Sequence, residues 1–368
     1  MSNAFRELLK KVGSGVHTGE DLSREEAAIA TRMMLTQEAT PAQIGAFMIA
    51  HRIKRPTSAE LAGMLDAYEQ IGPMLQPWGS RNGGNISTKG AFSQPMMVFG
   101  TPYDGRSRTA SVTPLTALIL ATAGVSVLMH GGECMPTKYG VPLIEIWQGL
   151  GVDLSKLTLV QVEQLLKTSG LGFIYLPQHF PEAQALVPYR DQIGKRPPFA
   201  TMELIWSPYA GDFHMVAGYV HPPTEVRFRE TLGMRKVTKF TLVKGLEGSC
   251  DLPRDRTAII AISQPDSTEG FERILLHPRD YSFAAKEVPL DSTLELIEQM
   301  LNVLNGKSSE LMSSAIWNGG FYLWRSGVCS DLPAGFTKAE ELFTGGHALQ
   351  KLQEIKGAIA SMQLTHQS

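Results

Sequence analysis

The sequence predicts a small N-terminal helical domain followed by a larger α/β domain with a mainly parallel central sheet. Three observations support this prediction. Helix-start signatures recur early in the chain, a segment rich in Gly, Pro and Asn covers 73–87, and strand and helix patterns alternate from about residue 95 onwards. We place the two domains at 1–80 and 81–368, and we expect a helix over 181–196 to pack on the first domain.

The helical domain is predicted from three paired signals. Ser23 with Glu26, Thr40 with Gln43, and Thr57 with Glu60 each place a capping side chain three residues before a carboxyl or amide. Apolar residues then recur at helical spacing, which is typical of core positions rather than of a cofactor site. These positions are Ile29, Met33, Leu35, Ile44, Phe47, Met48, Leu61, Met64, Leu65 and Tyr68.

The α/β domain begins with a predicted βαβ unit. The apolar run Met96–Phe99 indicates a buried strand, and a polar turn follows it. Thr113 before Pro114 is typical of a helix start, with Thr113 as the N-cap, and this helix is expected to end at Gly124. The run Val125–Met129 then predicts a second strand.

The turn over 100–113 is suited to bind an anion. A parallel crossover brings the strand ends at Gly100 and His130 to one edge of the sheet, where open α/β sheets bind ligands. The following helix N-terminus offers free N–H groups, and Arg106 and Arg108 add positive charge. Phosphate is the ligand that this pattern favours, and a solvated surface turn is the alternative.

Later segments continue the alternation of strands and helices. A helix capped at Thr158 is predicted to lead into a strand over 173–176. The remaining predicted elements are strands over 237–243 and 257–263 and helices over 294–304 and 339–355.

Composition excludes several classes of protein. Of the 368 residues, 43% are hydrophobic and 19% are charged, so the chain can bury a core without disulfides. The net charge of −2 gives no global attraction to a polyanion, and Cys134, Cys250 and Cys329 lack metal-ligand spacing. The longest apolar stretch, 115–129, is too short to cross a bilayer of about 30 Å, and no signal-peptide pattern opens the chain. We therefore expect a cytoplasmic protein with no membrane partner.

Several motifs resemble those of one known family. The stretches Pro41–Phe47 and His51–Lys54, the loop Gly100–Asp104, the strand end Met129–Gly132 and the pair Glu247-Gly248 match its motifs in chain order. They are similar to those of the anthranilate phosphoribosyltransferases, which share a class of glycosyltransferases with the pyrimidine nucleoside phosphorylases. The resemblance implies their fold and an enzyme that transfers ribosyl phosphate from phosphoribosyl pyrophosphate to an aromatic amine such as anthranilate, as in tryptophan biosynthesis.

The matched motifs are altered at specific residues. The family's Gly-Thr-Gly-Gly-Asp loop has Pro102 and Tyr103 at its third and fourth positions, so one amide donor is lost and bulk is added. Glu247 is the one carboxylate left of the family's metal-binding Asp-Glu pair. Arginines near the loop can bind phosphate without glycine amides, so we expect the pocket still to take a phosphorylated small molecule.

Under this enzyme hypothesis, each candidate site residue has an expected role. His130 and Arg190 would contact the acceptor, and Glu247 would hold Mg²⁺ if the metal binds. The phosphates and ribose of the co-substrate would be held by Gly100, Thr101, Asp104, Arg106, Arg108, Thr109, Ser111, Thr113 and Lys138.

A second hypothesis is a non-catalytic, dimeric protein that binds single-stranded nucleic acid on the same fold. The segments Tyr103–Arg106, Val112–Leu115 and Gly245–Gly248 resemble a divergent branch of the family that has been associated with nucleic-acid binding. Its contacts would come from Arg106, Arg108, Lys138, Arg190, Lys195, Arg196, Arg227, Arg229, Arg235 and Lys236. Under either hypothesis we expect a homodimer formed through the helical domain.

Overall fold

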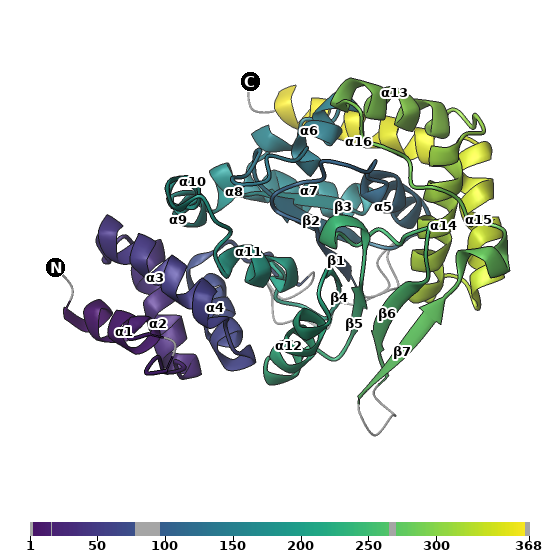
Figure 1. Ribbon diagram of the computed structural model, residues 1–368. Helices are drawn as coiled ribbons and strands as arrows, with labels where there is room; N and C mark the ends of the chain where they lie inside the picture. The colour runs from purple at the N-terminus through teal and green to yellow at the C-terminus, as the bar shows by residue number, and fades with distance from the viewer. Residues whose placement is uncertain (1–2, 16, 78–95, 265–269, 365–368) are drawn as a thin grey trace, which may run out of the picture.

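The structure, a computed structural model, describes residues 3–15, 17–77, 96–264 and 270–364. The N-terminal helices lie at one end of the molecule, and the sheet with its covering helices forms the rest (Figure 1). The predicted architecture of a helical domain followed by an α/β domain is confirmed. Most of the linker predicted at 73–87 lies outside the described residues.

The helical domain begins each of three helices with the predicted cap. Its helices are α1 (Asn3–Gly13), α2 (Arg24–Leu35), α3 (Pro41–Lys54) and α4 (Ser58–Ile71). Ser23, Thr40 and Thr57 each accept a backbone hydrogen bond from the third residue of the helix, whose side chain accepts from the cap in return. The predicted core positions are buried except for Ile29, which is 42% exposed, so its assignment to the core was wrong.

Helices from the later part of the chain pack against the helical domain. Helix α10 (Val187–Ile193) lies against α3, and α12 (Pro222–Met234) lies against α4. The Thr231 hydroxyl of α12 donates to the carbonyl oxygen of Ser58 at 3.1 Å, which fixes this second contact. The two parts of the chain are therefore joined through packed helices as well as through the linker.

The α/β domain is built on one sheet with the strand order β3-β2-β1-β4-β5-β6-β7. Strands β1 to β5 pair in parallel, and β6 and β7 add an antiparallel edge. The carboxyl ends of β1, β2, β4 and β5 consequently lie along one edge of the sheet. The strands are β1 (Met96–Gly100), β2 (Val127–Gly131), β3 (Leu171–Tyr175), β4 (Phe213–Gly218), β5 (Phe240–Val243), β6 (Ala258–Ser263) and β7 (Phe271–Leu276).

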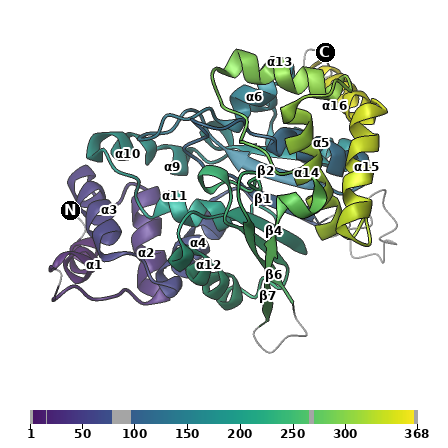
Figure 2. The ribbon, with the colours of Figure 1, turned by 45° about the vertical axis from the view of Figure 1, so that its right-hand side comes forward.

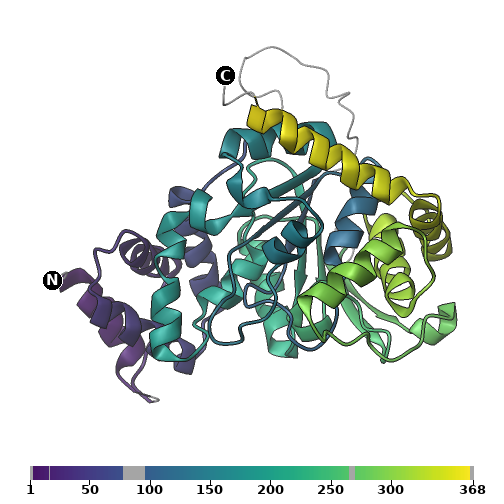
Figure 3. The ribbon, with the colours of Figure 1, turned by 90° about the horizontal axis from the view of Figure 1, so that it is seen from above.

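Helices cover this sheet. Helix α16 packs on α5 and α7, and α14 packs on α5 and α15. Figure 2 shows α13 to α16 gathered at the end of the molecule opposite the N-terminal helices, and the view from above in Figure 3 shows α16 running along the α/β domain. The remaining α-helices are α5 (Thr113–Thr122), α6 (Leu143–Gly149), α7 (Leu159–Ser169), α8 (Leu176–His179), α9 (Pro181–Gln184), α11 (Phe199–Met202), α13 (Thr293–Leu304), α14 (Glu310–Arg325), α15 (Leu332–Thr344) and α16 (His347–Leu364). The 3₁₀ helices are η1 (Leu154–Lys156), η2 (Glu203–Ile205), η3 (Leu246–Gly248) and η4 (Pro278–Tyr281).

Some predicted elements differ from the structure. Thr113 is the first residue of α5 rather than its N-cap, because its hydroxyl donates to Asp251 instead of serving the helix. The helix predicted over 181–196 is two helices, α9 and α10. The helix predicted over 339–355 is also two, because α15 ends before the pair Gly345-Gly346 and α16 begins after it.

Candidate functional site

A cleft of about 690 Å³ lies between the helical domain and the carboxyl edge of the sheet. The end of α3 contributes Arg52 and Arg55, and α12 contributes Arg227. Asp104 comes from the turn after β1, and Arg196 from the segment after α10. The cleft therefore lies where an open α/β sheet binds ligands, and four of its lining side chains are arginines.

Two of these arginines have no carboxylate partner among the described residues. Arg196 pairs with Asp104 at 2.6 Å, and Arg52 donates to the backbone carbonyl of Arg196 at 3.0 Å. Within the described part of the chain, no carboxylate pairs with Arg55 or Arg227. Burial lowers the pKa of Arg227, and the positive charge of Arg55 lowers it further. The cleft thus holds more positive charge than its own acids neutralise, as an anion-binding site requires.

The turn after β1 does form an anion cradle, which we define as the backbone of 107–109 together with Lys138. The anion in it is the carboxylate of Glu247. Its Oε1 accepts from the amides of Arg108 and Thr109 at 3.0 Å each and from the Thr109 hydroxyl at 2.8 Å. Its Oε2 accepts from the amide of Ser107 at 3.2 Å and lies 2.8 Å from Nζ of Lys138.

The environment of Glu247 holds the carboxylate ionised. Its side chain is 3% exposed, and burial alone would raise its pKa. The hydrogen bonds from Lys138 and Thr109 and the charge of Lys138 outweigh burial and keep the pKa of Glu247 well below its usual range. The cradle thus stabilises the negative charge of a carboxylate from the chain itself, whereas the sequence predicted a phosphate at this turn.

Arg106 lies behind the cradle and is fully engaged by the protein itself. Its guanidinium is 2.7 Å from the carboxylate of Asp251 and donates to Ser249, Thr109 and the carbonyl oxygen of Ala110. Both members of the Arg106–Asp251 pair are buried. The structure therefore gives Arg106 the role of bracing the turn, where the sequence predicted a phosphate contact.

His130 is also closed off by protein groups. It is 1% exposed, its Nε2 lies 3.0 Å from the carbonyl oxygen of Trp206, and its Nδ1 lies 2.6 Å from the hydroxyl of Tyr103. A carbonyl can only accept, so Nε2 carries the proton and Nδ1 accepts from Tyr103. Burial lowers the pKa of His130 to about 4, against the partial effect of the Trp206 carbonyl.

Arg190 forms a second buried ion pair. Its partner is Glu203, and the Tyr68 hydroxyl donates to the same carboxylate oxygen at 2.9 Å. Nε of Arg190, Oε2 of Glu203 and Nε1 of Trp206 are buried without a hydrogen-bond partner among the described residues. The Arg190 guanidinium is therefore paired with the carboxylate of Glu203, whereas the sequence predicted that it would contact the acceptor substrate.

The predicted site residues lie in different places in the structure: some line the cleft, and others surround the carboxylates of Glu247 and Asp251. Asp104 and Glu247 line the cleft. Gly100 packs so tightly that a side chain there would collide with the backbone of Leu204. Around the carboxylates of Glu247 and Asp251 the structure collects Arg106, Arg108, Thr109, Ser111, Thr113 and Lys138. Thr101 is 5% exposed and lies in the same turn.

Sequence reasoning missed four residues that matter to these sites. Asp251 and Glu203 are the internal partners of Arg106 and Arg190, and Arg52 and Arg55 line the cleft. Asp251 lies four residues after Glu247, just beyond the recognised motif, and this closeness was an available signal. No signal in the sequence identified Glu203, because only the fold brings it to its partner Arg190.

The residues present do not fit a magnesium ion at Glu247. Both oxygens of this carboxylate are taken by N–H and O–H donors and by the cation of Lys138. Across the described ranges no group of three or more His, Cys, Asp or Glu side chains could hold a metal ion. A hard cation needs several oxygen ligands, and none converge here.

The cations expected to contact nucleic acid do not form one free patch. Arg106 and Arg190 are buried in ion pairs. Arg229 pairs with Glu225 at 3.1 Å, and Arg235 pairs with Asp66 and Glu69. Phosphate backbones bind to unpaired surface cations, so this arrangement does not favour the nucleic-acid hypothesis.

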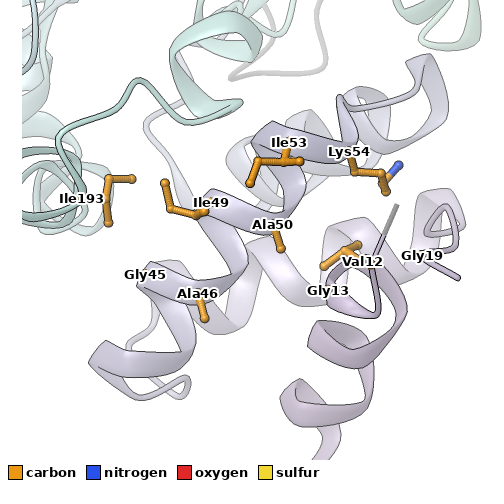
Figure 4. A pocket seen from close by; sticks show the side chains of 11 residues that line it. Val12, Gly13, Gly19, Gly45, Ala46, Ile49, Ala50, Ile53, Lys54 and Ile193 are labelled. Atoms are coloured by element: carbon orange, nitrogen blue, oxygen red, sulfur yellow. The ribbon is translucent and has the colours of Figure 1, made fainter. Parts of the chain in front are cut away.

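An apolar groove of about 810 Å³ lies on the helical domain. Figure 4 shows Ala46, Ile49 and Ile53 of α3 along it, with Val12 of α1 and Ile193 of α10 at its sides. Ile53 is 65% exposed. Among the described residues, no helix is both long enough and apolar enough to span a membrane.

A helical bundle joined to an α/β domain is the architecture of a family of glycosyl transferases. The chain matches the helical bundle domain of the glycosyl transferase family over residues 6–71 and its a/b domain over residues 98–349. The chain belongs to this glycosyl transferase family, as its motifs indicated.

Individual relatives are distant but match most of the chain. An anthranilate phosphoribosyltransferase of Chromobacterium violaceum is 26% identical over 343 residues, which cover 92% of this chain and 94% of the relative. An uncharacterized protein of Aquifex aeolicus is also 26% identical, over 88% of this chain and 93% of its own.

Solved structures share the fold at lower identity. The anthranilate phosphoribosyltransferase of Saccharomyces cerevisiae in complex with PRPP and Mg has a TM-score of 0.80 at 16% identity, covering 98% of this chain and 99% of its own. The enzyme from Thermus thermophilus has a TM-score of 0.76 at 20% identity, covering 98% and 100%. These values confirm the predicted fold.

Proposed function

We propose that this protein is a phosphoribosyltransferase-like enzyme that binds a phosphorylated ribosyl donor in the arginine-lined cleft. The observation that carries the proposal is the convergence of Arg52, Arg55, Arg196 and Arg227 on one cleft at the carboxyl edge of the sheet. Membership of the glycosyl transferase family and the phosphoribosyltransferase relatives support the same reaction class. The donor we propose is phosphoribosyl pyrophosphate, and the acceptor an aromatic amine such as anthranilate.

The reaction depends mainly on positioning the two substrates and on stabilising the charge that develops in the transition state. The bond between C1 of the ribose and the pyrophosphate oxygen breaks, the acceptor nitrogen bonds to C1, and the nitrogen loses a proton to solvent. Arg55 and Arg227, which have no carboxylate partner in the described part of the chain, can neutralise the departing pyrophosphate through charge-assisted hydrogen bonds. The buried residues His130 and Arg190 need take no part in this scheme.

Calorimetry tests the proposal directly. Phosphoribosyl pyrophosphate titrated into the wild-type protein should release or absorb heat at one site per chain. The heat should be nearly the same with and without Mg²⁺, because the donor set around Glu247 does not suit a metal. No heat at millimolar donor would overturn the proposal. Release of pyrophosphate in the presence of anthranilate or other aromatic amines then identifies the acceptor.

Nucleic acid remains the weaker candidate. Several cations that it would need are held in ion pairs within the described chain. Filter binding of single-stranded DNA at low and raised salt separates the two functions, because nonspecific retention falls steeply with salt. We expect little retention even at low salt.

A further inference from the structure

We propose that Glu247 is a built-in anion that fills the cradle and excludes an external phosphate or diphosphate from it. The cleft and the cradle are adjacent, since Glu247 and Gly248 line the cleft wall. The inference concerns the cradle, whereas the proposed function concerns the arginines of the cleft. Either can fail without the other.

The first argument is the number of donors. Three consecutive backbone amides, the hydroxyls of Ser107 and Thr109 and the ammonium of Lys138 all point at one carboxylate. Consecutive amides that converge in this way form an anion-binding concavity. A phosphate oxyanion has three oxygens for such donors, and a carboxylate has two. The donor set is therefore larger than a carboxylate needs and suits a phosphate.

The second argument is charge. Lys138, Arg106 and Arg108 place cations within 2.8, 3.6 and 3.7 Å of the Glu247 carboxylate. Asp251 balances Arg106, so one carboxylate faces the two remaining cations. Loss of the Glu247 charge would leave an unbalanced positive site that opens on the cleft.

The third argument is the backbone that holds Glu247 in place. Its φ is 55°, in the left-handed region that non-glycine residues seldom adopt. The neighbouring Gly245 has no room for a side chain, because a Cβ there would lie 2.0 Å from the carbonyl oxygen of Ser249. Strain of this kind persists only where the surroundings enforce it, and here the cradle contacts do so.

Replacing Glu247 should open the cradle. Glu247→Gly suits this test because glycine adopts the observed φ without strain, so the backbone should keep its path. Calorimetry with inorganic pyrophosphate should show the Gly variant binding at least about tenfold more tightly than wild type, since several charge-assisted hydrogen bonds become available. Inorganic phosphate should show a smaller gain in affinity.

Two controls distinguish pyrophosphate binding in the cradle from a nonspecific effect of the change in net charge. Glu298→Gln removes one negative charge from an exposed position on α13 and should leave pyrophosphate affinity at the wild-type value. Adding Lys138→Met to Glu247→Gly should abolish the gain, because Lys138 makes the shortest cationic contact in the cradle.

The proposal is overturned if folded Glu247→Gly binds pyrophosphate no better than wild type, or if Lys138→Met leaves the gain intact. If Glu247→Gly fails to fold, Glu247→Asp replaces it. The shorter side chain keeps the charge but cannot reach all the donors, so a folded Asp variant should gain a smaller but measurable affinity. Wild-type affinity in a folded Asp variant would equally overturn the proposal.

Discussion

The phenol of Tyr103 donates a 2.6 Å hydrogen bond to Nδ1 of His130, while Nε2 of the same ring donates to the carbonyl oxygen of Trp206. Tyr103 is one of the residues that replace glycine in the loop after β1, and it is 4% exposed. The altered loop therefore inserts a side chain that seals the strand-end histidine. Both ring nitrogens are used, and the imidazole is held neutral in one tautomer.

This arrangement predicts a stability loss in mild acid. The pKa of His130 is about 4 in the folded protein, against 6.5 for an ordinary histidine. The unfolded chain takes up a proton below pH 6.5 that the folded protein refuses until about pH 4. His130 therefore contributes its full stability above pH 6.5, and the contribution is lost as the pH falls from about 6.5 towards 4.

Urea unfolding at pH 7.5 and pH 5 measures the effect. From pH 7.5 to pH 5, His130 should lower the free energy of unfolding of the wild type by about 2 kcal/mol. In His130→Gln the free energy of unfolding should fall by about that much less over the same interval. Burial also lowers the pKa of His214, to about 3, so His214→Gln should lose a similar share of the pH dependence and serves as a second test of the same effect. An equal pH dependence in wild type and His130→Gln would contradict the prediction.

A second prediction concerns the buried pair of Arg190 and Glu203. Glu203→Gln leaves the guanidinium buried without a counter-charge, and we expect a loss of about 3–5 kcal/mol in the free energy of unfolding. The double variant Arg190→Met/Glu203→Leu should be less destabilised than the sum of the two single variants, because no charge is left unpaired.

The control for this pair is an exposed ion pair. Lys10 and Glu7 are 2.8 Å apart on α1 with both side chains exposed, and Lys10→Met should cost less than about 1 kcal/mol. Denaturant unfolding of all variants at pH 7 gives the coupling energy. Additive losses for Arg190 and Glu203 would show that the pair is not coupled as its geometry implies.

Local signals account for what the sequence predicted about the fold. Capping boxes at Ser23, Thr40 and Thr57 depend on side chains three residues apart, so they are visible in any short window. Strand β4 and helix α14 were not predicted. Helix α14 contains Gly319-Gly320, a pair that is typical of a helix end in the sequence. In the structure these glycines let α15 approach closely, because a Cβ on Gly320 would lie 2.4 Å from the Phe336 side chain.

The candidate site was predicted only where its signals are local in the sequence. The sequence predicted that the turn after β1 would bind a phosphate, and in the structure its amides donate to the carboxylate of Glu247. The identity of its anion could not be predicted, because Glu247 lies 138 residues beyond Thr109 and reaches it only through the parallel pairing of β1, β4 and β5. The partner of Arg190 depended on the fold in the same way.

A third prediction tests the arginines of the cleft. Arg227→Ala should weaken binding of phosphoribosyl pyrophosphate by about tenfold or more, as expected for a lost hydrogen bond between charged groups. The melting temperature should change little, because Arg227 has no carboxylate partner in the described structure to lose. Arg279→Ala, at a 78% exposed position on η4, is the control and should bind as wild type. Unchanged affinity in Arg227→Ala would remove this arginine from the donor site.

The last prediction concerns self-association through the groove on α1 and α3. Ile53 projects beside the hollow that it lines, so each copy offers both an exposed apolar side chain and an apolar surface, as a twofold contact requires. Ile53→Glu should place a charge in that contact and shift the protein from dimer to monomer in light scattering coupled to gel filtration. Leu294→Glu changes an 84% exposed residue on α13 in the same way and should leave the dimer intact. A wild-type monomer at micromolar concentration, or a dimer insensitive to Ile53→Glu, would show that the groove does not join two copies.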